Sequence, residues 1–217
     1  MTTTPTLTLY DYFRSSASYR VRIALHLKGL AFGQVGVHLL REEQVAPAYL
    51  SLNPQGLVPT LRHGPLVLTQ SMAILEYIDE LHPQPPLLPG AIEARARTRQ
   101  LALLIACDIH PLNNLRVLKY LAQDPSFDDA RKQAWIRHWI AAGFDALEAE
   151  LAASLAGRFC VGDAPTLADC CLVPQVFNAQ RFGIDIEHFP TVARIAAACS
   201  ELDAFQRAHP SRQPDAG

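Results

Sequence analysis

The apolar pattern of the sequence changes once, at the proline-rich residues 83–90, and this change constrains the fold more than any other feature. Before it, strand-like alternation is mixed with helical spacing. After it, every periodic stretch has helical spacing. Proline excludes a helix interior or a central strand from the segment itself, which we interpret as a semi-rigid linker. The sequence therefore predicts an α/β domain in residues 1–82 and an all-helical domain in residues 91–217.

The first domain is predicted to have the order β-α-β-β-α. Its strands are expected near residues 6–10, 35–39, 60–63 and 66–68, the last two as a hairpin around Gly64-Pro65. One helix follows a serine-rich turn and stops at Lys28-Gly29, and a second opens at Thr69-Gln70-Ser71. In the second domain the helices are predicted near residues 91–123, 128–156, 166–182 and 190–207.

Composition excludes several classes of function. The formal net charge of −2 gives no basic field for nucleic acid. No apolar run approaches the ~20 residues of a membrane span, and residues 1–6 lack the pattern of a secretory signal. The five cysteines are odd in number and form no Cys-x-x-Cys pair, which predicts free thiols in a reducing cytoplasm and no metal site.

Serines stand where a helix begins, at Ser15 and Ser16. Their ordinary interpretation is helix capping. The alternative is an anion site, because a helix N-terminus offers free N–H groups and a partial positive charge, and Arg14 stands beside it. One hydroxyl could then donate to a bound thiolate and lower its pKa. A serine nucleophile is the poorer alternative, since no histidine or acid close in sequence forms a relay.

Two dipeptides carry weaker signals of the same kind. Val58-Pro59 fits an edge strand, or a cis peptide that turns the Val58 backbone toward a peptide-like ligand. Gln70-Ser71 fits a helix cap, or a carboxylate site in which Gln70 fixes a neighbouring ammonium group.

The helical domain has one dense polar stretch, from Cys107 to Tyr120. A proline inside an apparently amphipathic helix, surrounded by His110, Asn114 and Arg116, is costly for a purely structural helix and suggests a site. Arg181 ends a later helix, where a favourable interaction with the helix C-terminus is the ordinary explanation.

Taken together, these motifs resemble the zeta class of glutathione transferases, which includes maleylacetoacetate and maleylpyruvate isomerases. The resemblance covers nearly the whole chain. It rests on the signature from Arg14 to Leu25, Asn53 to Pro59, Gln70-Ser71, Cys107 to Asn114, Gly162 to Asp169 and the tail His209 to Asp215. It implies a thioredoxin-like N-terminal domain, an α-helical C-terminal domain, glutathione as cofactor and a homodimer.

The resemblance also implies roles for individual residues. Ser15 is similar to the serine that stabilises the glutathione thiolate, with Ser16 and Arg14 beside it. Further glutathione contacts are implied for Ala17, Ser18, Tyr19, Arg20, Gln44, Val58, Pro59, Gln70, Ser71, His110, Asn114, Leu115 and Arg116. Arg14, Arg116 and Arg181 are expected to converge on one pocket and to receive an acidic substrate. One departure is Ala17, where many class members have cysteine.

The activity implied is the cis–trans isomerisation of a conjugated acidic diketone by reversible addition of the glutathione thiolate. Maleylacetoacetate, from tyrosine and phenylalanine breakdown, is the first candidate substrate, and maleylpyruvate, from gentisate breakdown, is the second. Two other functions stay open: a conjugating or dehalogenating transferase acting on small α-halo acids, and a non-catalytic thioredoxin-fold binding protein. A dithiol oxidoreductase is disfavoured, because no cysteine begins the first helix.

Overall fold

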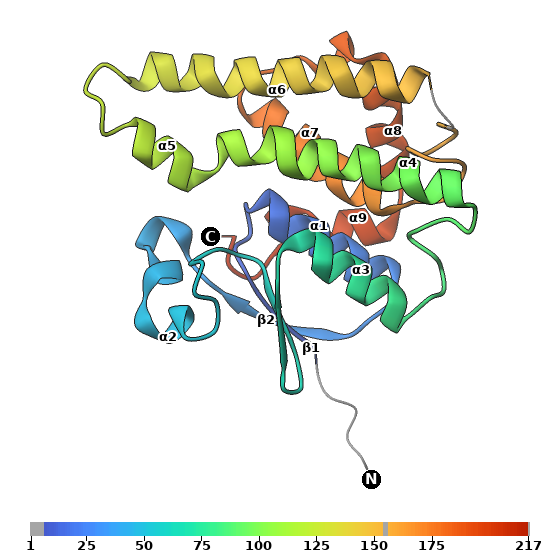
Figure 1. Ribbon diagram of the computed structural model, residues 1–217, viewed down its shortest axis with the longest axis horizontal. Coiled ribbons are helices and arrows are strands. Elements are labelled where there is room, and N and C mark those ends of the chain that lie inside the picture. Colours follow the sequence, from blue (N-terminus) through green and yellow to red (C-terminus); the bar gives the residue numbers. More distant parts are fainter. Residues whose placement is uncertain (1–6, 154–155, 217) are drawn as a thin grey trace. The chain divides into compact units, whose positions relative to one another are not determined.

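The chain divides into two compact units, which we describe separately. The computed structural model describes residues 7–153 and 156–216 (Figure 1). Unit 1 contains the residues up to Leu87 and those from Leu202 onward, whereas unit 2 is Leu88–Glu201. The proline-rich residues 83–90 between them contain no helix or strand.

Unit 1 is built on a mixed four-stranded sheet in the order β2-β1-β3-β4. The strands are β1 (Leu7–Asp11), β2 (Phe32–Gly36), β3 (Thr60–His63) and β4 (Leu66–Thr69). β1 pairs parallel with β2 and antiparallel with β3, and β3 and β4 form an antiparallel hairpin. This is the α/β arrangement that the sequence predicts.

Two helices cover one side of this sheet, α1 (Ser16–Leu27) and α3 (Ser71–Leu81), with the short α2 (Pro47–Leu50) between β2 and β3 (Figure 1). The helices share a core with the strands because their apolar residues recur on one face. Its buried members are Leu7, Leu9, Val21, Leu25, Leu61, Ile74 and Ile78. The core fixes α1 and α3 against the same strands and so places their N-termini in one unit.

The second strand differs from its prediction. The alternation of Val35, Val37 and Leu39 suggested a strand near 35–39, whereas β2 is Phe32–Gly36. Its extent is set by pairing with β1, in which Leu7 opposes Phe32 and Asp11 opposes Gly36. Beyond that register the chain leaves the sheet, and Leu39 begins a 3₁₀ turn. The first strand is Leu7–Asp11, and Thr6, which the prediction included, lies outside the described residues.

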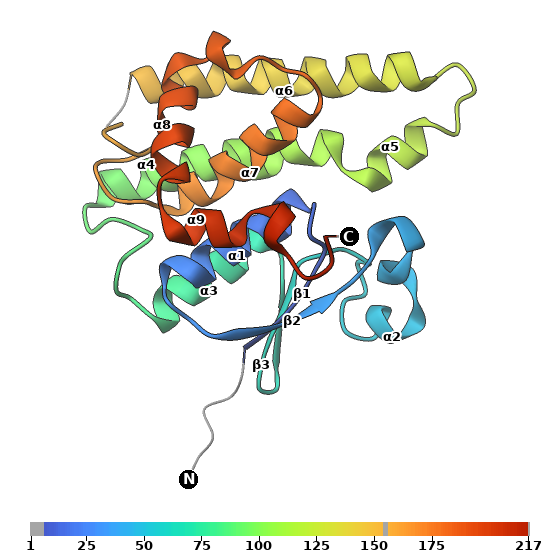
Figure 2. The same ribbon diagram turned by 180° about the vertical axis from the view of Figure 1, so that it is seen from behind.

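The C-terminal segment corrects the predicted domain boundary. Helix α9 (Asp203–Ala208) and the residues after it belong to unit 1, not to the helical unit. Both views show α9 alongside α1 (Figure 2). The Tyr19 hydroxyl donates to the Phe205 carbonyl at 3.5 Å, and Arg22 Nε donates to the Ala208 carbonyl at 3.1 Å. These contacts join residues 186 positions apart, which helical periodicity cannot reveal.

Unit 2 is helical throughout its described residues, apart from its turns and loops and one isolated bridge. Its helices are α4 (Ile92–Leu103), a π-helix (Leu104–Ile109), a 3₁₀ helix (His110–Asn113), α5 (Leu115–Leu121), α6 (Asp129–Ala152), α7 (Leu167–Arg181), a 3₁₀ turn (Ile186–His188) and α8 (Pro190–Ser200). Most of α7 is buried, and it packs against α4 and α8. Thr166 and Asp169 form the capping box at its start.

Two predicted helices are each divided. The one near 91–123 is interrupted at Asn114, whose extended backbone (ψ 143°) separates α5 from the preceding turn. The one near 190–207 is interrupted at Leu202, also extended (ψ 131°), between α8 and α9. In both cases an extended residue at an N-cap starts a new helix. The helix near 128–156 ends at Ala152, and residues 154 and 155 of the prediction lie outside the described residues.

One helical run in the described residues, Ile92–Leu121, is long and apolar enough to cross a membrane by length and composition alone. The core helix of a soluble protein passes the same test. Pro111 and the extended Asn114 interrupt the run, and its first part packs on α7. We therefore interpret it as part of the helical unit.

Candidate active site

The turn between β1 and α1 places Ser15 at the N-cap of α1. Its backbone is extended (φ −67°, ψ 117°), and its Oγ accepts a hydrogen bond from Ser18 N at 3.2 Å. The backbone N–H of Ser15 donates to the Tyr12 carbonyl at 2.9 Å, which closes the turn. Because a hydroxyl has one donor and two acceptor sites, the capping bond leaves the proton of Ser15 for donation. The cap and an active hydroxyl are therefore compatible.

Positive charge and helix dipole combine at this turn. The first turn of α1 contains no acidic residue. Arg14 Nη2 donates to the Tyr12 hydroxyl at 3.0 Å, and the guanidinium lies over the Phe13 ring at 5.1 Å. Ser18 is fully buried, and its Oγ has no partner. An anion held here would meet an arginine and the positive end of a helix.

The start of α3 is joined to α1 by a buried arginine. Arg20, only 2% exposed, donates from Nη1 to Ser71 Oγ at 3.1 Å. Ser71 is the first residue of α3, and Gln70 before it has a left-handed φ of 68°. The Gln70 side chain donates to Gln55 Oε1 at 2.9 Å. The structure thus links Ser71 to the helix that begins beside Ser15.

The loop before β3 is held rigidly just before Val58-Pro59, whose peptide bond is cis. The Leu57 carbonyl accepts from Tyr49 Oη at 2.6 Å and from Asn53 Nδ2 at 2.7 Å. Both side chains are buried, and both also bond to Thr60 Oγ1 after the cis peptide. Of the two interpretations of Val58-Pro59, the structure has the cis form.

Gln44 lies against the same loop through its backbone. Gly56 has a left-handed φ of 62°, and a side-chain carbon there would approach the Gln44 carbonyl to 3.2 Å. Glycine suits this position in both respects. The Gln44 Oε1 atom is buried and has no hydrogen-bond partner. It is thus a second unpartnered polar atom, with Ser18 Oγ, among the predicted glutathione contacts of unit 1.

The predicted residues of unit 2 fall into two places. His110 begins the 3₁₀ helix, and Asn114 caps α5 by accepting from Arg116 N at 3.1 Å. Leu115 is half-buried and Arg116 is exposed. Arg181 ends α7, exposed, with its guanidinium 5.6 Å from the Phe182 ring. The convergence of both arginines with Arg14 stays a prediction.

Two residues that shape the loop in unit 1 were not predicted to do so: Tyr49, and Asn53, which was named only as the start of a motif. A signal was available for Asn53, because asparagine before proline favours an Asx turn, and Gln55 N does donate to Asn53 Oδ1 at 3.0 Å. Tyr49 gave none, because its contact with Thr60 depends on the folded loop.

A separate cavity of about 370 Å³ opens in unit 1 between the end of β2 and the segment around α2. None of the predicted site residues lines it; its walls include Tyr10, Val37, Ala46 and Leu52. Within residues 7–153 and 156–216, no group of three or more His, Cys, Asp or Glu side chains is placed to hold a metal ion.

Comparison with known proteins finds two family models along the chain. The family described as "Glutathione S-transferase, N-terminal domain" matches residues 5–80, and "Glutathione S-transferase, C-terminal domain" matches residues 128–210. The probable maleylacetoacetate isomerase of Vibrio cholerae is 50% identical over 97% of this chain and 98% of its own. A bacterial maleylpyruvate isomerase, described as a zeta-class glutathione S-transferase, has a TM-score of 0.94 at 50% identity, covering 97% of this chain and all of its own.

The chain belongs to the zeta-class glutathione transferases. A further similar structure is the maleylacetoacetate isomerase of Methylobacterium extorquens with bound malonate and GSH, at 44% identity and a TM-score of 0.93, covering 97% of this chain and 99% of its own. The family recognised from the motifs and the fold it implies, a thioredoxin-like unit with a helical unit, are therefore confirmed. In this zeta-class chain the signature residues form the β1–α1 turn and the start of α3.

Proposed function

We propose that this chain catalyses a glutathione-dependent cis–trans isomerisation of a conjugated diketo acid, with maleylacetoacetate as the first candidate substrate. The observation that carries the proposal is the placement of Ser15. It caps α1 beside Arg14 while its hydroxyl proton remains for donation to an anion. The names of the relatives point to the same reaction.

The residues of unit 1 fit glutathione as the cofactor. Ser18 Oγ and Gln44 Oε1 are buried polar atoms without partners, and a peptide-like ligand with N–H and carboxylate groups would satisfy such atoms. Ser71 and the first N–H groups of α3 suit a carboxylate, with Gln70 beside them for an ammonium group. The Leu57 carbonyl is already held by Tyr49 and Asn53, which fixes the loop on which the predicted glutathione contacts Val58 and Pro59 lie.

Bound glutathione would supply a thiolate for reversible addition to the cis double bond of the substrate, which would permit rotation about that bond, and the same thiolate would leave as the trans double bond forms. The protein must keep that sulfur ionised at neutral pH, although an ordinary thiol has a pKa near 8.5. Ser15 donates a hydrogen bond to the sulfur and the N-terminus of α1 adds favourable potential, which together lower a thiol pKa.

Three arginines are proposed to serve the substrate. An arginine guanidinium can bind a carboxylate with two hydrogen bonds, which suits Arg14, Arg116 and Arg181 to this role. In this proposal they anchor the carboxylates and stabilise the negative charge that develops on the diketone during addition. His110, Asn114 and Leu115 contribute further contacts from unit 2.

Maleylpyruvate is the second candidate, because the structural relative with a TM-score of 0.94 is named for it. The experiment that tests the proposal measures the glutathione-dependent absorbance change of the purified protein with each substrate. A kcat/KM at least tenfold higher for one of them, about 1.4 kcal/mol of transition-state discrimination, assigns the substrate. If the protein binds glutathione but converts neither substrate, the proposed isomerase activity is contradicted and a conjugating or dehalogenating transferase is favoured.

We also propose that the protein is a cytoplasmic homodimer. Its five cysteines are free in the structure, four of them buried, which suits a reducing compartment. Sedimentation or light scattering of the purified chain would test the dimer, for which a mass of twice 23.9 kDa is expected.

A further inference from the structure

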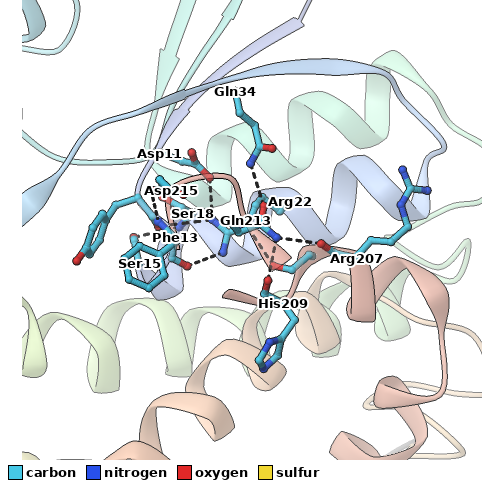
Figure 3. A network of polar contacts seen from close by, with 12 residues as sticks. Asp11, Phe13, Ser15, Ser18, Arg22, Gln34, Arg207, His209, Gln213 and Asp215 are labelled. Carbon is cyan, nitrogen blue, oxygen red and sulfur yellow. Dashed lines mark hydrogen bonds and ion pairs between the residues drawn. The ribbon is translucent and has the colours of Figure 1, made fainter. Parts of the chain in front are cut away.

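The C-terminal tail reaches the turn that carries Ser15. Gln213 and Asp215 lie in a segment that the sequence analysis recognised only as a family motif. Asp215 Oδ2 accepts a hydrogen bond from Phe13 N at 2.9 Å, between residues 202 positions apart (Figure 3). Phe13 is two residues before Ser15, so the contact falls inside the β1–α1 turn.

Phe13 is held on both sides of its backbone. Its N–H donates to Asp215, and its carbonyl accepts from Arg22 Nη2 at 2.8 Å. Arg22 is fully buried and also donates from Nη1 to Asp11 at 2.7 Å and from Nε to the Ala208 carbonyl at 3.1 Å. The backbone that leads into Arg14 and Ser15 is therefore fixed by one group from the tail and one from α1.

The tail itself is anchored by Gln213, which is 7% exposed. Its Nε2 donates to the carbonyls of Arg207 and His209 at 2.9 and 2.8 Å, and its Oε1 accepts from Gln34 Nε2 of β2 at 3.0 Å. Figure 3 shows these bonds, which hold the segment after α9 against β2. Asp215 also lies against β2, since a side-chain carbon added at Gly36 would be 3.5 Å from Asp215 Cβ.

We infer that Asp215 is a positioning residue for the thiolate site, which acts through Phe13 to fix Arg14 and Ser15 and is itself placed by Gln213. The inference rests on the proposed function only in assigning the thiolate to Ser15. A surface tail with a purely stabilising role needs no acceptor on this particular N–H. Here the acceptor falls in the one turn whose geometry sets the direction of the Ser15 hydroxyl.

The experiment compares four variants with the wild-type protein, one of which is Gln213→Ala. Asp215→Ala removes the acceptor of Phe13 N–H, whereas Asp215→Asn keeps an oxygen in the same place and removes the charge. Asp203→Ala is the matched control, an exposed aspartate of the same segment whose carboxylate lies 3.6 Å from Arg207. For each protein we would measure the pKa of the bound glutathione thiol by the ultraviolet absorbance of the thiolate, the glutathione Kd by calorimetry and the thermal midpoint.

The expected result for Asp215→Ala is a rise of about one unit in the thiol pKa and about a tenfold loss in kcat/KM, because the hydrogen bond from Phe13 N–H to the Asp215 side chain holds the turn. For Asp215→Asn we expect a thiol pKa and a kcat/KM close to those of the wild type. For Asp203→Ala we expect both values to match the wild type. Gln213→Ala loosens the tail but leaves Asp215 in place. We expect it to shift the thiol pKa and kcat/KM in the same directions as Asp215→Ala, but by smaller amounts.

Two outcomes would overturn the inference. In the first, Asp215→Ala lowers the thermal midpoint but leaves the thiol pKa and kcat/KM unchanged, which makes the tail a stabilising element only. In the second, Asn and Ala both lower the thiol pKa, which is the direction that loss of a nearby negative charge gives, and the effect is then one of charge rather than of position. If Asp215→Ala does not fold, an unchanged thiol pKa and kcat/KM in Gln213→Ala with a lower thermal midpoint gives the first outcome, and a lowered thiol pKa in Asp215→Asn gives the second. A wild-type protein that does not bind glutathione would instead refute the proposed function.

Discussion

Ser15 has two roles in the proposed site, and they can be separated by substitution. Its Oγ accepts the N–H of Ser18 as the cap of α1, and its hydroxyl is proposed to donate to the glutathione thiolate. Alanine removes both roles. Aspartate keeps the capping acceptor but, when ionised, has no proton to donate. Threonine keeps a hydroxyl and is the conservative control.

The magnitudes follow from each role. Loss of an N-cap costs about 1 kcal/mol of unfolding free energy, which for a chain of this length lowers the thermal midpoint by roughly 2–4 °C. Loss of a hydrogen bond to a charged group costs about 1.5–3 kcal/mol, which is about a 10- to 150-fold decrease in kcat/KM. We therefore expect Ser15→Ala to be less stable and less active, and Ser15→Asp to be nearly as stable as the wild type but inactive.

The assay combines thermal unfolding with glutathione-dependent isomerisation and the pKa of the bound thiol. Ser15→Thr should keep the thermal midpoint within about 2 °C and retain part of the activity, because threonine is only slightly the poorer cap. An active Ser15→Asp protein would refute the thiolate role. A Ser15→Ala protein with an unchanged thermal midpoint would refute the stabilising role of Ser15 as the cap of α1.

Three further predictions concern the rest of the molecule. Burial, and secondly the charge of Arg207, lower the pKa of His26 from 6.5 to about 4. The folded state therefore disfavours protonation of His26, and the free energy of unfolding should fall as the pH decreases from about 6.5 to about 4. His26→Gln should flatten this part of the profile of stability against pH. A methyl group at Gly143 would come within 2.3 Å of the side chain of Ile109, which is 1% exposed, so Gly143→Ala should destabilise by about 1–3 kcal/mol, partly offset by about 1 kcal/mol of helix propensity. Cys107 is the exposed one of the five free cysteines, so an aromatic disulfide reagent should modify one thiol per native chain quickly, and Cys107→Ser should remove that phase.

Each of these has a control within the chain. The exposed His82→Gln should leave the acid limb of the profile unchanged. Gly90→Ala, with nothing within 4 Å of the added carbon, should be neutral or slightly stabilising, and Ile109→Val should relieve part of the cost of Gly143→Ala. An equal loss of stability in Gly143→Ala and Gly90→Ala, or fast modification of a buried thiol such as Cys160, would contradict the packing described above.

Local interactions explain what the sequence could predict. Ser15 caps a helix by a bond to a residue three positions later, and the hairpin of β3 and β4 turns at Gly64, so both features are visible in short stretches of sequence. The limits of β2 depend instead on pairing with β1, which lies 25 residues away at the pair of Leu7 and Phe32. The alternation of apolar residues continues past Gly36 to Leu39, but the strand ends at Gly36.

Long-range contacts explain what the sequence could not predict. The tail from Leu202 onward has the helical spacing and polar end of a terminal segment, and nothing in that pattern assigns it to unit 1. Its membership follows from bonds to Phe13, Tyr19 and Arg22 that span about 190–200 residues. The motif was recognised, yet its place in the fold was missed, because a motif gives residue types and not their partners.

The pair Arg20 and Arg22 shows how one helix connects these parts. Residues two apart on an α-helix point roughly 200° apart, so two arginines at this spacing face opposite sides. Arg20 donates to Ser71 at the start of α3, and Arg22 donates to Asp11, the Phe13 carbonyl and α9. Burying a guanidinium is costly unless its donors are paired, and Arg22 meets this condition through Asp11 and the carbonyls of Phe13 and Ala208. The helix that begins at Ser15 is thereby fixed on one side to the second predicted anion site and on the other to the tail, and the geometry of the thiolate site depends on both.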